Sequence, residues 1–162
     1  MSIRKKPWNR VNLPVYSISS SDGQGHYNMH ICIYVSAVSM IPKRFAVAVY
    51  KGTRTLENIK NNPHFVLQLL SKNQYGLVAL LGKKSGKSTD KIGKLSKRNM
   101  LTYWQSFPVL NQAAAVMEMK VKEETDAGDH YLYICDVVRS KNFNASHLLT
   151  LDDLRKRKLI RI

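Results

Sequence analysis

The stretch NMHICIYVSAVS at residues 28–39, followed by FAVAVYKGTRTLENI at residues 45–59, decides how the chain folds. β-Branched and aromatic residues dominate both stretches up to residue 50, and they alternate there with small or polar ones. Such alternation is typical of strands with one buried face. We therefore expect one long strand over residues 26–39, or two strands that meet at a bend, and a further strand over residues 45–50.

The rest of the chain can be divided into expected strands, turns and helices in the same way, apart from one segment. YGLVALL at 75–81 is too short an apolar run to assign to a strand or a helix. Thr53 or Thr55 is expected to cap the first helix, and Thr150 the last one. A mostly β chain with a few short helices fits a small barrel in a single domain. Further strands are expected at 13–20, 64–71, 113–124 and 130–138, with turns at 21–25 and 125–129, and helices at 53–61, 89–99 and 150–158.

Composition excludes several classes of protein. The chain has 162 residues, of which 44% are apolar and 23% charged, so it can bury a core and is not disordered. No apolar run reaches the roughly 20 residues of a membrane helix, and we expect no membrane insertion. Two cysteines, Cys32 and Cys135, are too few for a disulfide framework or a four-cysteine zinc site. The basic start leads into no apolar signal core, so we expect a cytoplasmic protein.

The net charge is unusual, because 26 Lys and Arg face 11 Asp and Glu, which gives +15. Three blocks supply most of it: residues 1–12, which we expect to form a basic arm, residues 83–98, and residues 152–161. A positive field attracts nucleic acid, acidic lipid or phosphorylated small molecules. The aromatic residues are not interleaved with basic ones as a base-stacking surface requires, which argues against nucleic acid. A basic nucleic-acid-binding protein nevertheless remains an alternative.

Three local motifs suggest chemistry that their details do not support. GKKSGKS at 82–88 has three residues between its glycines, whereas a P-loop needs four. GQGHYN at 23–28 lacks the third glycine of a dinucleotide fingerprint and enters a strand, so it reads as a hairpin turn. His30 and Cys32 share one strand face, but no second pair completes a metal site. We therefore predict no metal.

Three stretches, in this order, resemble the flavin reductase-like proteins with an FMN-binding split barrel. The first is the pair of segments at 28–39 and 45–59, similar to the family's Asn-Ala-Met-Thr, Val-Ser pair and Thr that opens a helix. The second is LGKKSGKSTDK at 81–91, close to Ser-Gly-x-x-x-Asp-Lys. The third is GDHYLY at 128–133, close to a Gly-Asp-His hairpin. Here MHI at 29–31 replaces Ala-Met-Thr and MIPKR at 40–44 replaces Asp-Pro-Pro, so His30 or backbone amides would substitute for the missing threonine hydroxyl.

The resemblance implies a fold and a function. The fold is a six-stranded antiparallel split β-barrel with flanking helices over residues 13–162, in a homodimer. The cofactor is FMN, with FAD as an alternative, and NAD(P)H is the electron donor. The activity is NAD(P)H-dependent flavin reduction or flavin-mediated electron transfer. A non-catalytic FMN carrier or sensor is the main alternative.

The resemblance also implies a set of site residues. From the residues alone, without the family resemblance, Thr53 and Thr55 are interpreted as helix caps and Lys91 as a solvated cation. Read with it, hydroxyls, cations and helix N–H groups form a phosphate site, and the strand at 28–36 lines the flavin ring. His130 would lie near the ring or a nicotinamide as the candidate catalytic residue; otherwise it is a hairpin histidine bonded to Asp129. The implied cofactor-binding residues are Asn28, Met29, His30, Ile31, Tyr34, Ser36, Tyr50, Lys51, Thr53, Arg54, Thr55, Ser85, Gly86 and Lys91.

Overall fold

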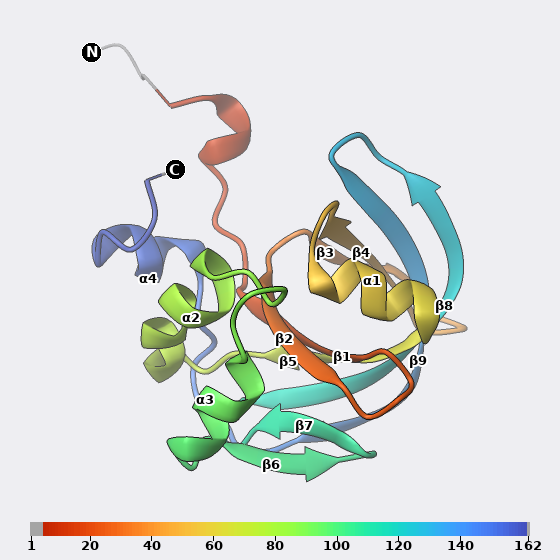
Figure 1. Cartoon of the computed structure of the whole chain (residues 1–162). Coiled ribbons are helices and arrows are strands. Elements are labelled where there is room, and N and C mark those ends of the chain that lie inside the picture. The colour runs from red at the N-terminus through yellow and green to blue at the C-terminus, as the bar shows by residue number, and fades with distance from the viewer. Residues whose placement is uncertain (1–4, 162) are drawn as a thin grey trace.

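A computed structural model of the chain describes residues 5–161 and shows a mostly β architecture (Figure 1). Seven strands form one sheet in the order β2-β1-β5-β8-β9-β4-β3, and every neighbouring pair is antiparallel. The strands are β1 (Tyr16–Ser21), β2 (Tyr27–Cys32), β3 (Val35–Ser39), β4 (Arg44–Tyr50), β5 (His64–Leu69), β8 (Ala115–Asp126) and β9 (His130–Asn142).

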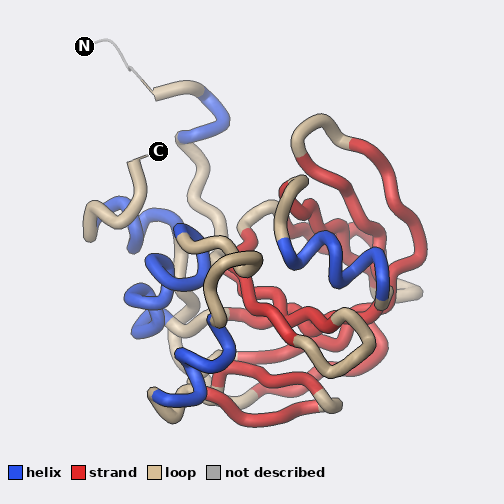
Figure 2. The backbone as a smooth tube through the Cα atoms, in the orientation of Figure 1, coloured by secondary structure: helices blue, strands red, loops and turns tan. Residues whose placement is uncertain are grey.

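The sheet curls into a barrel because β2 and β3 are consecutive in the chain but stand at opposite ends of the strand order. A bend at residues 33–34 joins them. There the Ala48 amide donates to the Tyr34 carbonyl at 2.9 Å, and the Cys32 thiol donates to the Ala48 carbonyl at 3.4 Å. The two-strand interpretation of residues 26–39 is therefore confirmed, and the bend brings the end of β2 against β4 (Figure 2).

In the described part of the chain, four short α-helices cover the barrel. Helix α1 (Arg54–Asn61) lies on one side, and α2 (Val78–Lys83), α3 (Lys91–Lys97) and α4 (Leu151–Lys156) gather on another (Figure 1). Two 3₁₀ helices are η1 (Pro7–Asn9) and η2 (Lys72–Leu77). Thr53, and not Thr55, caps α1 by accepting the Leu56 amide, while Thr150 caps α4 as expected. YGLVALL proves to be the end of η2 and the start of α2.

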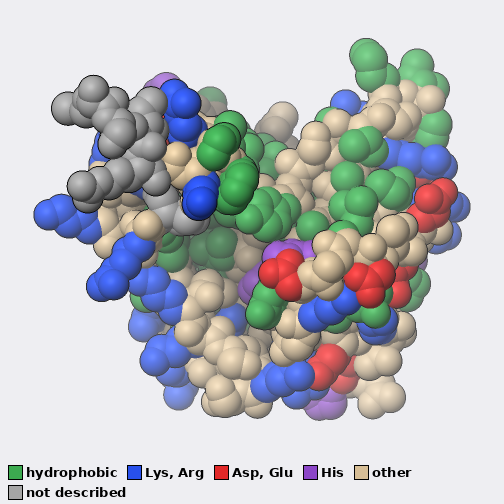
Figure 3. All heavy atoms as spheres, turned by 90° about the horizontal axis from the view of Figure 1, so that it is seen from above, with side chains coloured by type: hydrophobic (Ala, Val, Ile, Leu, Met, Phe, Trp, Pro, Cys, Tyr) green, Lys and Arg blue, Asp and Glu red, His purple; other side chains and the backbone are tan. Residues whose placement is uncertain are grey.

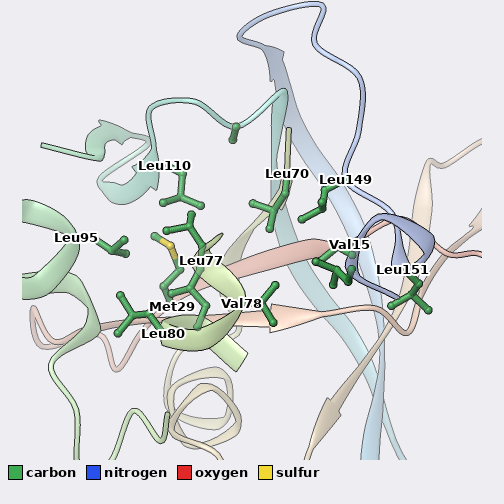
Figure 4. Packing of buried hydrophobic residues seen from close by; sticks show 13 residues of the cluster. Val15, Met29, Leu70, Leu77, Val78, Leu80, Leu95, Leu110, Leu149 and Leu151 are labelled. Atoms are coloured by element: carbon green, nitrogen blue, oxygen red, sulfur yellow. The ribbon is translucent and has the colours of Figure 1, made fainter. Parts of the chain in front are cut away.

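The core has two main parts. Inside the barrel, a cluster that includes Ile18, Val47, Phe65 and Tyr133 is closed by the apolar face of α1. Outside it, Met29 of β2 packs with leucines from α2, α3 and α4 (Figure 4). Removing apolar surface from water contributes about 25 cal/mol per Å². Burial of these side chains therefore provides most of the free energy that holds the three helices on the sheet. The cluster therefore fixes the segment between α2 and α3 beside β2.

The strand count differs from the expectation of six. Besides the seven-stranded sheet, β6 (Leu101–Trp104) and β7 (Phe107–Leu110) pair in a separate hairpin. The first strand begins at Tyr16 and not at residue 13. In the described part of the basic arm, the Asn12 side chain accepts the Asp152 amide at 3.0 Å, which ties the arm to α4; a domain boundary after residue 12 stays a prediction. None of the described helices is long and apolar enough to cross a membrane.

Candidate functional site

A groove runs along β2, between the start of α1 and the segment that joins α2 to α3. Its main hollow has a volume of about 480 Å³. A second hollow of about 580 Å³ shares the walls Asn28, Arg54, Gly86 and Lys91 with it. A third, of about 220 Å³, shares His30 and Tyr50. Because these three hollows share walls along β2, we call them together the β2 groove.

The walls of the β2 groove meet at a close contact between β2 and the segment that follows α2. The Asn28 amide, almost fully buried, donates to the Thr55 hydroxyl of α1 at 3.0 Å. A Cβ atom on Gly86 would collide with the Asn28 side chain, so a glycine is needed at this point. The contact therefore ties three segments far apart in the sequence into one site, with Asn28 at its centre.

Lys91 is buried in the wall, with only 3% of its surface exposed. Its ammonium donates to the Leu81 carbonyl at 3.0 Å, and among the described residues no carboxylate pairs with it. Burial lowers the pKa of Lys91 to about 8. The interpretation of Lys91 as a solvated cation is wrong, because the first residue of α3 points inward. A buried, uncompensated ammonium is costly, and an anion in the adjacent hollow would offset that cost.

The main hollow carries the charge pattern of an anion site. Arg54, Lys83, Lys84 and Lys91 line it, and none of its described lining residues is acidic. The first turn of α1 also faces this hollow through its cap, Thr53. Free N–H groups at a helix start and nearby cations together attract phosphate or carboxylate. Arg54 already pairs with Glu57 at 3.0 Å, and Lys83 and Lys84 are exposed to solvent, which leaves Lys91 as the one buried cation among the described residues of this lining.

His30 offers an unpartnered nitrogen where two hollows meet. Its Nδ1 atom is buried and has no hydrogen-bond partner among residues 5–161. Burial, then the charges of Lys91 and His130, lower the pKa of His30 to about 4. The imidazole is therefore neutral at pH 7, with one nitrogen able to accept and the other to donate a hydrogen bond. An orphaned polar atom in a groove wall is suited to a polar ligand edge.

An aromatic wall closes the third hollow. The His130 ring stands edge-on between Tyr34 and Tyr50, with 5.3 Å between centroids in each pair. The Nδ1 atom of His130 lies 2.7 Å from the Asp129 carboxylate, as expected for a hairpin histidine bonded to its neighbour. His130 also lines the third hollow, so the two interpretations of this residue are compatible. Tyr34 and Tyr50 are about half exposed, so neither is a core residue.

Three predicted site residues do not line the groove with their side chains. Met29 is fully buried in the cluster under the helices, since alternate residues of β2 face opposite sides. Ser36 is exposed on β3 and donates to the Ala37 carbonyl. Lys51 turns away to pair with Asp126 at 2.8 Å. The other predicted residues line one or more hollows: Asn28, His30, Ile31, Tyr34, Tyr50, Thr53, Arg54, Thr55, Ser85, Gly86, Lys91 and His130.

Several lining residues were not expected from the sequence. Lys83 and Lys84 stand at the end of α2, and their charge run was the available signal. Gly52, with a φ of 82°, turns the chain from β4 into α1 beside the main hollow. His26 and Asn58 line the second hollow; His26 stands in the hairpin-turn motif GQGHYN, which gave no sign of a site, and Asn58 stands in no recognisable motif. These residues come together only through the fold.

Comparison with solved structures shows the same fold in several flavoproteins. An FMN-binding protein from Thermus thermophilus superposes with a TM-score of 0.74 at 20% identity, over 88% of this chain and 80% of that one. A flavoredoxin from Methanosarcina acetivorans gives 0.72 at 21% identity, over 87% and 76%. The flavin reductase PheA2 gives 0.73 at 22% identity, over 88% and 87%. At these identities the likeness concerns the fold.

Sequence comparison agrees with the structural one. The chain is 26% identical over 156 residues to a Nostoc sp. (strain PCC 7120 / SAG 25.82 / UTEX 2576) protein named "Putative diflavin flavoprotein A 1", over 94% of this chain and 26% of that protein. It thus spans about a quarter of the length of this curated relative. The family model described as "Flavin reductase like domain" matches residues 8–157. Because that match covers nearly the whole chain, the protein belongs to the flavin reductase-like domain family.

Proposed function

We propose that this protein binds FMN in the β2 groove and works as an NAD(P)H-dependent oxidoreductase of the flavin reductase type. The observation that carries the proposal is Lys91, a buried ammonium without a carboxylate partner at the wall of a cation-lined hollow. Membership of the flavin reductase-like family supports it. FMN is the proposed flavin and FAD the alternative, since the cations of the main hollow offer a place for the phosphate that both carry.

In this proposal, different parts of the groove hold the two ends of an FMN molecule. Thr53 and the first turn of α1, with Arg54 and Lys91, would hold the phosphate, and Gly86 would let the backbone approach it. The orphaned Nδ1 of His30 would serve the polar edge of the ring. In the sheet, β2 has a strand on one edge only, so its other edge offers backbone groups to that ring.

The residues around the third hollow have a distinct role in this proposal. When bound, FMN supplies the redox chemistry by accepting a hydride from a nicotinamide and passing electrons on. The wall of Tyr34, His130 and Tyr50 would orient the donor ring and exclude water. Because Asp129 lies 2.7 Å from His130 Nδ1, it would fix the tautomer, leaving the Nε2 atom to face the ligand.

The visible spectrum tests this proposal. Purified protein titrated with FMN, FAD and riboflavin should bind FMN most tightly, and anaerobic mixing with NADH or NADPH should bleach the bound flavin. A protein that is yellow but inert to both nicotinamides would be a flavin carrier or sensor. His130→Gln should slow bleaching without changing FMN affinity by more than about threefold, since His130 lies outside the phosphate end. Unchanged spectra after FMN is added would refute flavin binding.

We also propose a homodimer formed through the exposed apolar turn between β3 and β4. Met40 and Ile41 there are 83% and 95% exposed, which is unusual for large apolar side chains, and Figure 3 shows hydrophobic groups at the outer rim of the molecule. Met40→Ser/Ile41→Ser should convert a dimer to a monomer in light scattering after size exclusion. The control Trp8→Ser, which removes an exposed aromatic elsewhere, should not. A wild-type monomer at micromolar concentration would refute the dimer.

Two free, buried cysteines suit a reducing compartment, and we propose that the protein works in the cytoplasm. Fractionation of cells that express the tagged chain tests the location, and recovery in a membrane or exported fraction would refute it.

A further inference from the structure

The basic residues that follow the three helices gather on one side of the molecule. Helices α2, α3 and α4 pack on the same apolar cluster, so their outer surfaces adjoin (Figures 1 and 2). In Figure 3 Lys and Arg crowd this side, whereas acidic groups lie mainly on the other. Six of the 11 acidic residues fall within residues 118–136, on β8, β9 and their turn. We call seven exposed cations here the basic face: Lys83, Lys84, Lys94, Lys97, Arg98, Lys156 and Lys158; Arg157, also exposed, stacks on Tyr75 and is not counted.

The basic face carries much more positive than negative charge. In the described part of the chain, none of its seven cations forms an ion pair. Asp90, the one acid between residues 83 and 98, is occupied as the cap of α3 and accepts the Gly93 amide at 2.9 Å. By contrast, Lys87 just outside the face pairs with Glu57 at 2.7 Å. An uncompensated field of this kind destabilises the compact state, and a negative partner would relieve it.

The basic face adjoins the β2 groove. Lys83 and Lys84 belong to both, since they line the main hollow and are exposed at its rim. We propose that the basic face docks a small acidic electron-carrier protein beside the groove. This proposal rests on the proposed function, because only a redox site at the groove would give an electron carrier a reason to bind here.

The residue types on this side favour a protein over a nucleic acid. With Arg157 included, six of the eight exposed cations here are lysines. Lysines act as hydrated point charges suited to steering a transient protein encounter, whereas the planar fork of arginine binds phosphate backbones best.

The test measures binding of a plant-type [2Fe–2S] ferredoxin, a small acidic electron carrier, by fluorescence anisotropy. We expect affinity to fall at least about tenfold between 20 and 200 mM NaCl, as for charge-steered pairs. Lys94→Gln/Lys97→Gln should weaken binding about fivefold, since exposed charges contribute modestly each. The matched control Lys43→Gln/Lys141→Gln removes two exposed charges elsewhere and should change it less than about twofold.

Three outcomes overturn the docking proposal: no ferredoxin binding at 20 mM NaCl, equal weakening by both double variants, or tighter binding of a 20-base-pair DNA duplex that competes with ferredoxin. The measurement is made with and without FMN. If FMN itself does not bind but ferredoxin still binds through Lys94 and Lys97, the proposed function fails and the docking surface stands. If FMN binds and ferredoxin does not, only the docking proposal fails.

Discussion

Lys91→Met tests the anion site most directly, because it removes the buried charge and leaves a side chain of similar length. The loss of one charge-assisted hydrogen bond to a phosphate is about 1.5–3 kcal/mol, which corresponds to roughly 10- to 150-fold weaker FMN binding at pH 7. Riboflavin, which has no phosphate, should bind wild type and variant equally. Flavin fluorescence quenching measures both affinities.

The pH dependence of FMN affinity is a second test of the role of Lys91. Because burial lowers the pKa of Lys91 to about 8, the ammonium predominates below pH 8 and the neutral amine above it. Bound phosphate favours the ammonium, so FMN affinity should be greatest below pH 8 and fall about tenfold between pH 7 and 9. His30, with a pKa of about 4, stays neutral throughout. Lys91→Met should flatten this profile.

The expected control is again riboflavin, whose affinity should not follow this profile. Folding responds with the opposite sign: the lowered pKa means that the unfolded chain binds the Lys91 proton more readily, so stability should rise between about pH 8 and 10.5. If Lys91→Met binds FMN as tightly as wild type at pH 7, or keeps the decline towards pH 9, Lys91 does not hold the phosphate.

Three further outcomes follow from the geometry. Gly86→Ala should lower the free energy of unfolding by about 1–3 kcal/mol and weaken FMN binding, whereas the control Gly76→Ala, where a Cβ meets open space, should change stability by less than about 0.5 kcal/mol in urea titrations. Thr53→Ala should cost about 1 kcal/mol and lower Tm by about 3 °C in calorimetry, and an unchanged Tm would contradict its role as the α1 cap. Burial raises the pKa of Cys32 and of Cys135 to about 12, so neither should react with a thiol reagent at pH 8 until the chain is unfolded; prompt labelling of native protein would contradict this.

The sequence predicts much of the barrel because local signals agree with the fold. The hairpin of β8 and β9 has long alternating strands and Gly128, with a φ of 97°, in its turn. The β6–β7 hairpin could not be predicted, because its sequence lacks the usual local signals of a hairpin. Its turn residues Gln105 and Ser106 both have positive φ, at 50° and 67°, although neither is a residue that usually marks such a turn. Its strands have only four residues each.

The motifs predict which segments form the candidate site. The wrong assignments concern residues whose side chains point in a direction that the motifs do not reveal. Met29 follows Asn28 directly, so on a strand it faces the other side of β2 and enters the core. Lys91 looked like one of many surface lysines, and only the inward start of α3 shows that it is buried. The sequence contains no signal for the orphaned nitrogen of His30, because that property depends on every group packed around it.

The position of β2 at the end of the strand order also has a kinetic consequence. A terminal strand is held by hydrogen bonds on one edge and opens by local fraying, whereas β5, between β1 and β8, is held on both. Amide protons of β2 should therefore exchange with deuterated water well before those of β5. A ligand bound in the β2 groove should slow amide exchange in β2 more than in β5, so the exchange rate of β2 would report ligand binding.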